Sequence, residues 1–186
     1  MKKTILGDVY AFRTDRGYRL LQWAYFMEKQ GKFVRIFPGF YGERPANLQS
    51  IVEGDCSYML NFDIPKLYRK GLLELWGSFP LDDLHPFPTH DIHFFQYADR
   101  GEFEICEFLC HQKSETYIGD ATGKGIPEKY RHIKLVNGVV DPIWFLYLLS
   151  SDFDMTHWHL FNPKEKWDEF EKKYGDLIFG KGKTKT

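Results

Sequence analysis

The sequence predicts an α+β fold made mainly of antiparallel β-strands, with a strongly bent sheet or partly open barrel, a few short helices and a C-terminal helix packed on the sheet. Aromatic residues make up 18% of the 186-residue chain and recur in short runs with β-branched residues, a composition typical of strands. Glycine-containing turns separate the first runs at hairpin spacing. Helix-start signals precede an amphipathic pattern at 162–175.

The first three strands are expected at 8–13, 18–27 and 32–37. Gly17 and Gly31 lie in the short turns between them, where tight hairpin loops require a positive φ. The second strand carries apolar residues on both faces. Because a strand at a sheet edge or on a solvated face would alternate, we expect the second strand to be central and covered on both sides.

After Pro38 and Gly39 the pattern becomes irregular, and Pro45 opens a predicted short helix that ends at Gly54. Strands are expected again at 57–62, 72–79, 92–97 and 102–110. The proline-rich segment 80–88 between them is expected to be an exposed bend. Segment 130–136 fits either a strand or a helix.

The last third is expected to contain two helices. One begins at Asp141 with Pro142 in its first turn, and a strand at 156–161 follows it. The terminal helix has Asn162 as its N-cap, Pro163 at its first position and Gly175 at its end. Its apolar stripe, which we expect to pack on the sheet, consists of Trp167, Phe170 and Tyr174.

Residues 1–180 are predicted to form a single domain, and 181–186 a disordered tail. The three cysteines are an odd number without the spacing of a disulfide scaffold, which favours reduced thiols. The sequence shows neither a signal-peptide pattern nor an apolar run of membrane-spanning length. We therefore expect a cytoplasmic monomer without a membrane partner.

The histidines are the strongest candidates for an enzymatic site in this sequence. His157 and His159 lie two apart on an expected strand and so share a face, while His85, His90 and His93 surround the proline-rich bend. If both groups converged they could bind a metal, and the chain would be a metal-dependent hydrolase. The alternative is that the first pair is half-buried in the sheet and the bend histidines are solvated. We favour this second reading and expect no metal, no other cofactor and no catalytic residue.

A nucleic-acid partner is not expected, because the formal net charge of −1 provides no concentrated basic excess. A small-barrel ligand-binding module remains an alternative. Its nucleic-acid form would need a basic, aromatic face, for which the local source is Arg13, Arg16, Arg19 and Arg35.

Two segments instead combine carboxylates with apolar residues, LDDLHPFPTHD and SSDFDM. This composition suits a protein partner with a basic surface. The predicted partner-binding residues are Asp82, Asp83, Asp152 and Asp154.

Three stretches together resemble the immunity protein 26 family of bacterial polymorphic toxin systems. They are GDVYAFRTDRGYRLLQWAYF with its Gly-Asp start and Gln22, GKFVRIFPGFYGE with its V-R-I-F strand, and KGLLELWGSFPL with its Trp and Gly. The resemblance covers 6–88, followed by a β-rich extension at 89–161 and the terminal helix. It implies a protein that binds and inhibits a cognate toxin without catalysis, and it carries no functional residues across.

A binding protein and a metal-dependent hydrolase should differ in the amount of bound metal. We expect protein purified without added metal to contain no stoichiometric zinc when measured by elemental analysis, because the two histidine groups are expected to lie too far apart to share one coordination sphere. One zinc per chain would contradict this prediction and favour the hydrolase.

Overall fold

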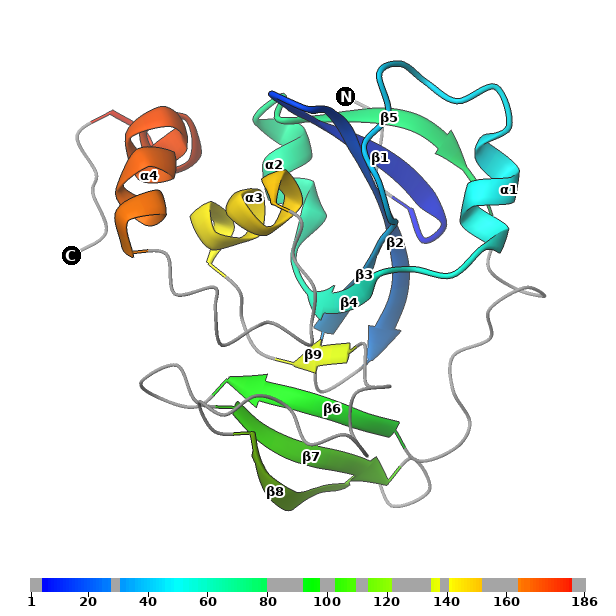
Figure 1. Cartoon of the computed structure of the whole chain (residues 1–186), viewed down its shortest axis with the longest axis vertical. Helices are drawn as coiled ribbons and strands as arrows, with labels where there is room; N and C mark the ends of the chain where they lie inside the picture. The colour runs from blue at the N-terminus through cyan, green and yellow to red at the C-terminus, as the bar shows by residue number, and fades with distance from the viewer. Residues whose placement is uncertain are drawn as a thin grey trace.

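The computed structural model describes residues 5–27, 31–79, 92–97, 103–109, 114–121, 135–137, 141–151 and 164–181. Over these ranges the chain forms an α+β fold with mainly antiparallel strands (Figure 1). The N-terminal strands make a curved five-stranded antiparallel sheet in the order β5-β1-β2-β3-β4. In the described part of the chain this sheet does not close into a barrel, so the bent-sheet form of the predicted fold is confirmed.

The five strands lie where the sequence places them, to within two residues at each end. Their bounds are β1 (Asp8–Thr14), β2 (Gly17–Met27), β3 (Gly31–Ile36), β4 (Tyr58–Asn61) and β5 (Leu73–Ser78). Gly17 has a φ of 115°, as the tight turn after β1 requires. A Cβ at this position would also lie 2.6 Å from the carbonyl oxygen of Tyr41. The close approach of the 38–41 loop therefore requires glycine as well.

A second group of strands extends the sheet. It consists of β6 (Ile92–Tyr97), β7 (Phe103–Leu109), β8 (Ser114–Ala121) and β9 (Leu135–Asn137). β6, β7 and β8 pair in antiparallel fashion, whereas β9 pairs in parallel with both β4 and β6 and so joins the two groups. The strands β6 and β7 are confirmed, and β8 was not predicted. Of the segment 130–136, which fitted either a strand or a helix, the described end at 135–136 is strand, and 130–134 lie outside the described residues.

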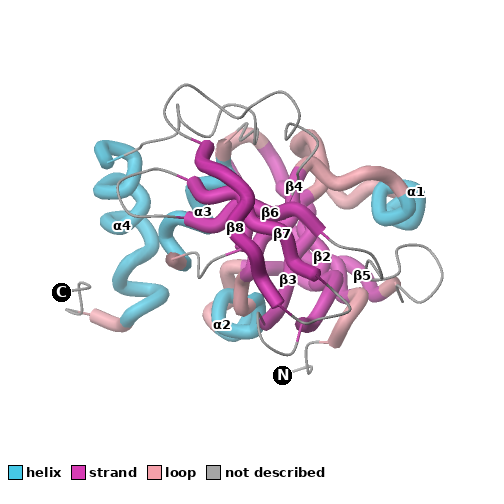
Figure 2. Tube along the Cα trace, turned by 90° about the horizontal axis from the view of Figure 1, so that it is seen from below, coloured by secondary structure: helices cyan, strands magenta, loops and turns pink. Residues whose placement is uncertain are grey.

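The strand β2 is covered on both faces, as its sequence predicts. Leu20 and Leu21 are each 0% exposed, yet they belong to different core clusters on opposite sides of the sheet. The helix α1 (Leu48–Glu53) covers the smaller cluster. The helices on the other side are α2 (Ile64–Arg69), α3 (Pro142–Ser150) and α4 (Lys164–Phe179) (Figures 1 and 2).

The helix α3 completes the larger core. It starts as predicted, because the Asp141 side chain accepts a hydrogen bond from the Ile143 amide at 2.8 Å and Pro142 occupies the first turn. Phe145 is fully buried and stacks on Phe62 at a centroid distance of 3.9 Å. The hydrophobic core of the N-terminal sheet is therefore completed by α3, which begins at Pro142, long after β5 has ended at Ser78.

The predicted end of the terminal helix was wrong. Gly175 does not end it, because α4 continues to Phe179 and Gly180, with a φ of 95°, follows the last turn. A helical glycine costs about 1 kcal/mol relative to alanine, but here Gly175 is buried and the extra turn places Ile178 in the core at 3% exposure. Burial of an aliphatic side chain is worth about 1.5–3 kcal/mol, which outweighs that cost.

The two short helices α1 and α2 also differ from the prediction. Pro45 does not open α1, which begins at Leu48 after Asn47 accepts a hydrogen bond from the Ser50 amide. Gly54 is its C-cap, as predicted. The helix α2, which begins shortly after β4 ends at Asn61, was not predicted.

Several expectations fall outside the described residues. They are the bend at 80–88, the strand at 156–161, residues 182–186 of the tail predicted at 181–186, and the N-terminal cap of α4 at Asn162 and Pro163. The backbone of Trp167 lies in α4 but its side chain is not described, whereas Phe170 and Tyr174 pack against the larger core as predicted. Within the described ranges, no helix is both long enough and apolar enough to span a membrane.

The packing of α4 on the sheet can be tested by replacing one buried and one exposed residue of the helix. Ile178→Ala should lower the free energy of unfolding by about 2–5 kcal/mol, because it leaves a cavity in the core. Leu177→Ala removes a neighbouring aliphatic side chain that is 46% exposed and should cost at most about 1 kcal/mol. Urea unfolding monitored by circular dichroism measures both values, and equal losses in the two variants would contradict the packing of α4 on the sheet.

Candidate functional site

The predicted site residues are not tested by the structure. Asp82, Asp83, Asp152 and Asp154 lie outside the described residues, as do His85, His90, His157 and His159. His93 is in β6, where only the backbone is described. Among the described side chains, no group of three or more His, Cys, Asp or Glu residues is arranged to hold a metal ion.

The residues that carry the family resemblance instead meet in a buried polar network. Gln22 of β2 and Arg35 of β3 are opposite each other in the sheet register and are 0% and 3% exposed. The Arg35 guanidinium donates one hydrogen bond to Gln22 Oε1 at 3.2 Å. This pair lies on the sheet face that α1 covers.

Arg35 also holds the helix α1. Its guanidinium donates to the carbonyl oxygens of Val52 at 3.1 Å and Gly54 at 2.7 Å. These carbonyls belong to the last turn and the C-cap of α1, where helix carbonyls lack partners within the helix. A fork of several N–H donors is what arginine offers and lysine does not, so one side chain connects β2, β3 and α1.

Gln22 extends the network to the neighbouring strands β1 and β5. Its Nε2 donates to the carbonyl oxygens of Gly7 at 3.3 Å and Phe79 at 3.4 Å, at the start of β1 and the end of β5. Gly77 lies beside this junction, and a Cβ there would come within 2.8 Å of the Phe79 ring. The glycine of the Trp-Gly pair in the last quoted stretch is thus explained by close packing.

Asp8, the acidic residue of the Gly-Asp start, is also structural. It is 0% exposed, and its Oδ2 accepts hydrogen bonds from the Tyr10 hydroxyl and the Ile5 amide, both at 2.9 Å. Burial of the Tyr10 hydroxyl raises its pKa well above the usual value, and the hydrogen bond to Asp8 raises this pKa further. Tyr10 therefore stays protonated and acts as a donor, which fixes the entry of β1 into the sheet.

Two of the four N-terminal arginines are buried and cannot contribute to a basic face. Arg35 lies under α1, whereas Arg19 is 4% exposed and donates to the Gly39 carbonyl at 2.9 Å. The guanidinium groups of Arg16 and Arg19 lie 4.2 and 4.9 Å from the Phe40 ring centroid. These contacts fasten the 38–41 loop to β2, and they use side chains that the nucleic-acid alternative would need on the surface.

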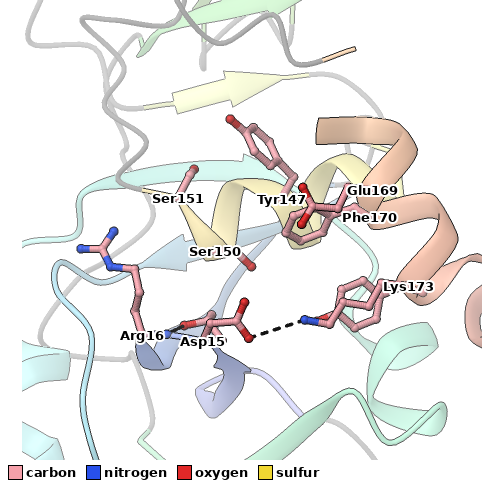
Figure 3. A pocket seen from close by; sticks show the side chains of 10 residues that line it. Asp15, Arg16, Tyr147, Ser150, Ser151, Glu169, Phe170 and Lys173 are labelled. Carbon is pink, nitrogen blue, oxygen red and sulfur yellow. Dashed lines mark hydrogen bonds and ion pairs between the residues drawn. The ribbon is translucent and has the colours of Figure 1, made fainter. Parts of the chain in front are cut away.

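The described surface has a cleft between the β1–β2 turn and the helices α3 and α4 (Figure 3). Its volume is ≈ 230 Å³. We call it the turn–helix cleft. Its lining combines hydroxyl groups, aromatic rings and charges of both signs: Thr14, Asp15, Arg16, Tyr147, Ser150, Ser151, Glu169, Phe170, Lys173 and Tyr174.

An ion pair in the turn–helix cleft joins Lys173 Nζ of α4 and Asp15 Oδ1 of the turn at 3.6 Å. A hydrogen bond with Tyr174 and the nearby Asp15 carboxylate raise the pKa of Lys173. Both side chains are largely exposed, at 52% and 95%, so the pair adds little to stability. Sequence reasoning missed the cleft because its residues come from three separate segments, and only the Asp-Arg-Gly turn was visible as a motif.

Neither the protein-family models nor the curated proteins match this sequence, and no solved structure matches this fold. The likeness to the immunity protein 26 family therefore stays a resemblance of sequence pattern. What the structure adds is the position of its residues, since Asp8, Gln22, Arg35 and Gly77 all serve the junctions of the N-terminal sheet.

The network predicts a specific effect of replacing its arginine. Arg35→Lys keeps the charge but cannot reach Gln22, Val52 and Gly54 together, and should lower the free energy of unfolding by about 1–3 kcal/mol. Hydrogen exchange should accelerate most at the amides of α1. Arg44→Lys, at an exposed position, is the control and should change stability by less than about 0.5 kcal/mol. Unchanged exchange at α1 in the Arg35 variant would show that the side chain does not hold the helix.

Proposed function

We propose that the protein binds and inhibits a cognate protein toxin stoichiometrically, without catalysis. The observation that carries this proposal is the buried network of Gln22 and Arg35, in which the polar residues of the family-like pattern bond to backbone carbonyls of β1, β5 and α1. Groups engaged in this way are unavailable for chemistry. They stabilise a scaffold, which is the role that the resemblance implies for the segment.

A rigid scaffold suits recognition of a protein. Association costs free energy when loops and side chains must be ordered, so a surface fixed in advance binds more tightly for the same contacts. In this protein β2 is covered on both faces, the 38–41 loop is fastened by Arg19, and Asp8 fixes the start of β1. These features support a binding role for the surface around the sheet.

The partner-binding residues remain those predicted from the sequence. Asp82 and Asp83 follow β5 in the chain, and Asp152 and Asp154 follow α3. Both segments therefore continue from elements that pack against the core. Carboxylates at such positions would meet a basic surface on the toxin, of the kind that binds nucleic-acid substrates, and would both steer association and block that surface.

The test is binding to the toxin encoded beside this chain in its genome. Isothermal titration calorimetry should give one-to-one binding, and the toxin should lose activity at equimolar protein. Reversal of Asp82, Asp83, Asp152 and Asp154 to lysine should slow association mainly at low salt, because steering by exposed charges is screened by ions. Circular dichroism should be unchanged.

The control for this experiment reverses four other exposed carboxylates, Glu43, Glu53, Asp168 and Asp176. It changes the net charge equally and should slow association much less. Equal effects of both sets would show that only net charge matters. Unchanged kinetics in the first set would place the interface elsewhere, and absence of binding by the unaltered protein would reject the proposed function.

A further inference from the structure

The turn–helix cleft has the chemistry of a receptor for one basic side chain. We propose that it accepts an arginine of the protein partner, a proposal that rests on the proposed function and gives it a defined contact. None of the four predicted carboxylates is among the described residues that line the cleft. Its residues come from the turn after β1, from the C-terminal end of α3 and from α4 (Figure 3).

The size of the cleft favours a side chain over a cofactor or metabolite. Its volume of ≈ 230 Å³ is below the range of about 300–1,000 Å³ that is usual for small-molecule pockets. A water molecule occupies about 30 Å³ of liquid, so the cleft has room for a single extended side chain together with a few waters.

The cleft offers several acceptor groups to a cation, while Arg16 and Lys173 balance its two carboxylates. The carboxylates of Asp15 and Glu169 line it, and the side chain of Asp15 is 95% exposed. The C-terminal end of α3 contributes the negative pole of a nine-residue helix. Ser150 and Ser151 donate their hydroxyl protons to the carbonyls of Leu146 and Leu148, which leaves the oxygen atoms of both serines as acceptors.

The aromatic walls select a planar cation. Phe170 packs edge-on against Tyr147 at a centroid distance of 5.6 Å and lies 5.7 Å from Tyr174, so three rings border the cleft. A guanidinium group stacks on aromatic faces and forms paired hydrogen bonds with carboxylates, which an ammonium group does less well.

The protein already places its own cation in this cleft. Lys173 lies 3.6 Å from Asp15 and 5.3 Å from the centroid of the Tyr174 ring, the two kinds of contact that an incoming arginine would make. Arg16 lies over Phe40, and Figure 3 shows its guanidinium pointing away from Asp15 and Lys173. Because the Lys173–Asp15 pair is exposed and weak, a partner's arginine can displace Lys173 at little cost.

The first test uses N-acetyl-arginine amide as a probe, titrated into the full chain at millimolar concentration and followed by ¹⁵N NMR. Saturable shifts should appear at the backbone amides of 14–16, 147–151 and 169–174. N-acetyl-norleucine amide, which lacks the charge, should produce none. Absence of saturable shifts with the arginine probe, or equal shifts with both probes, would overturn the proposal.

Variants make the test specific. Asp15→Asn should weaken binding of the probe about two- to five-fold, the range of an exposed ion pair. Lys173→Met should strengthen binding by a similar factor, because it removes the competing cation, while Lys172→Met at the exposed neighbouring position should change nothing. A purely structural Lys173 would give weaker binding or none in its variant, which would overturn the proposal.

The same variants separate this proposal from the proposed function. If the toxin binds all of them as it binds the unaltered protein and the probe gives no saturable shifts, the cleft proposal fails while toxin binding stands. If the toxin does not bind the unaltered protein, the proposed function fails, and the probe titration still decides whether the cleft accepts a guanidinium group.

Discussion

The fold depends on how the Arg35 guanidinium is satisfied inside the protein. Removing this group from water is costly unless its donors are bonded, and three of the acceptors it uses come from β2 and from the end of α1. Gln22 accepts from Arg35 through its Oε1, and its Nε2 donates to backbone carbonyls at the ends of β1 and β5. One buried cation therefore fixes the relative positions of four strands and a helix, which hydrophobic contacts alone would leave less uniquely defined.

The opposite face of the sheet is organised differently. There Tyr58 donates to the Leu148 carbonyl at 3.3 Å, and burial raises the pKa of Tyr58 above its usual value, so that it remains a donor. Phe145 and Ile178 fill the space over the same strands. The 6–88 segment that resembles an immunity protein thus shares its larger core with the helices α3 and α4. Among the described residues, the core therefore extends beyond the segment that carries the resemblance.

Local pattern was sufficient to predict the first five strands, because alternation and glycine turns are properties of neighbouring residues. It was insufficient where tertiary packing decides. Gly175 resembles a helix end, but the burial of Ile178 one turn later continues α4, and the arginines at 19 and 35 resembled surface charges until their carbonyl partners were known. The turn–helix cleft was beyond prediction for the same reason, since its three segments meet only in the folded chain.

The division between scaffold and cleft follows from the environment of their charges. Arg35 is buried, so losing its partners would leave an uncompensated charge and several orphan carbonyls, and the fold would weaken. Lys173 and Asp15 are exposed, so water replaces either partner and the fold is nearly indifferent to their pairing. Residues of the second kind can change partners without unfolding anything. The proposed exchange of the Lys173–Asp15 contact for one with a toxin requires this property. Under that proposal, substitutions in the cleft would change the affinity for the toxin and leave the Arg35 network intact.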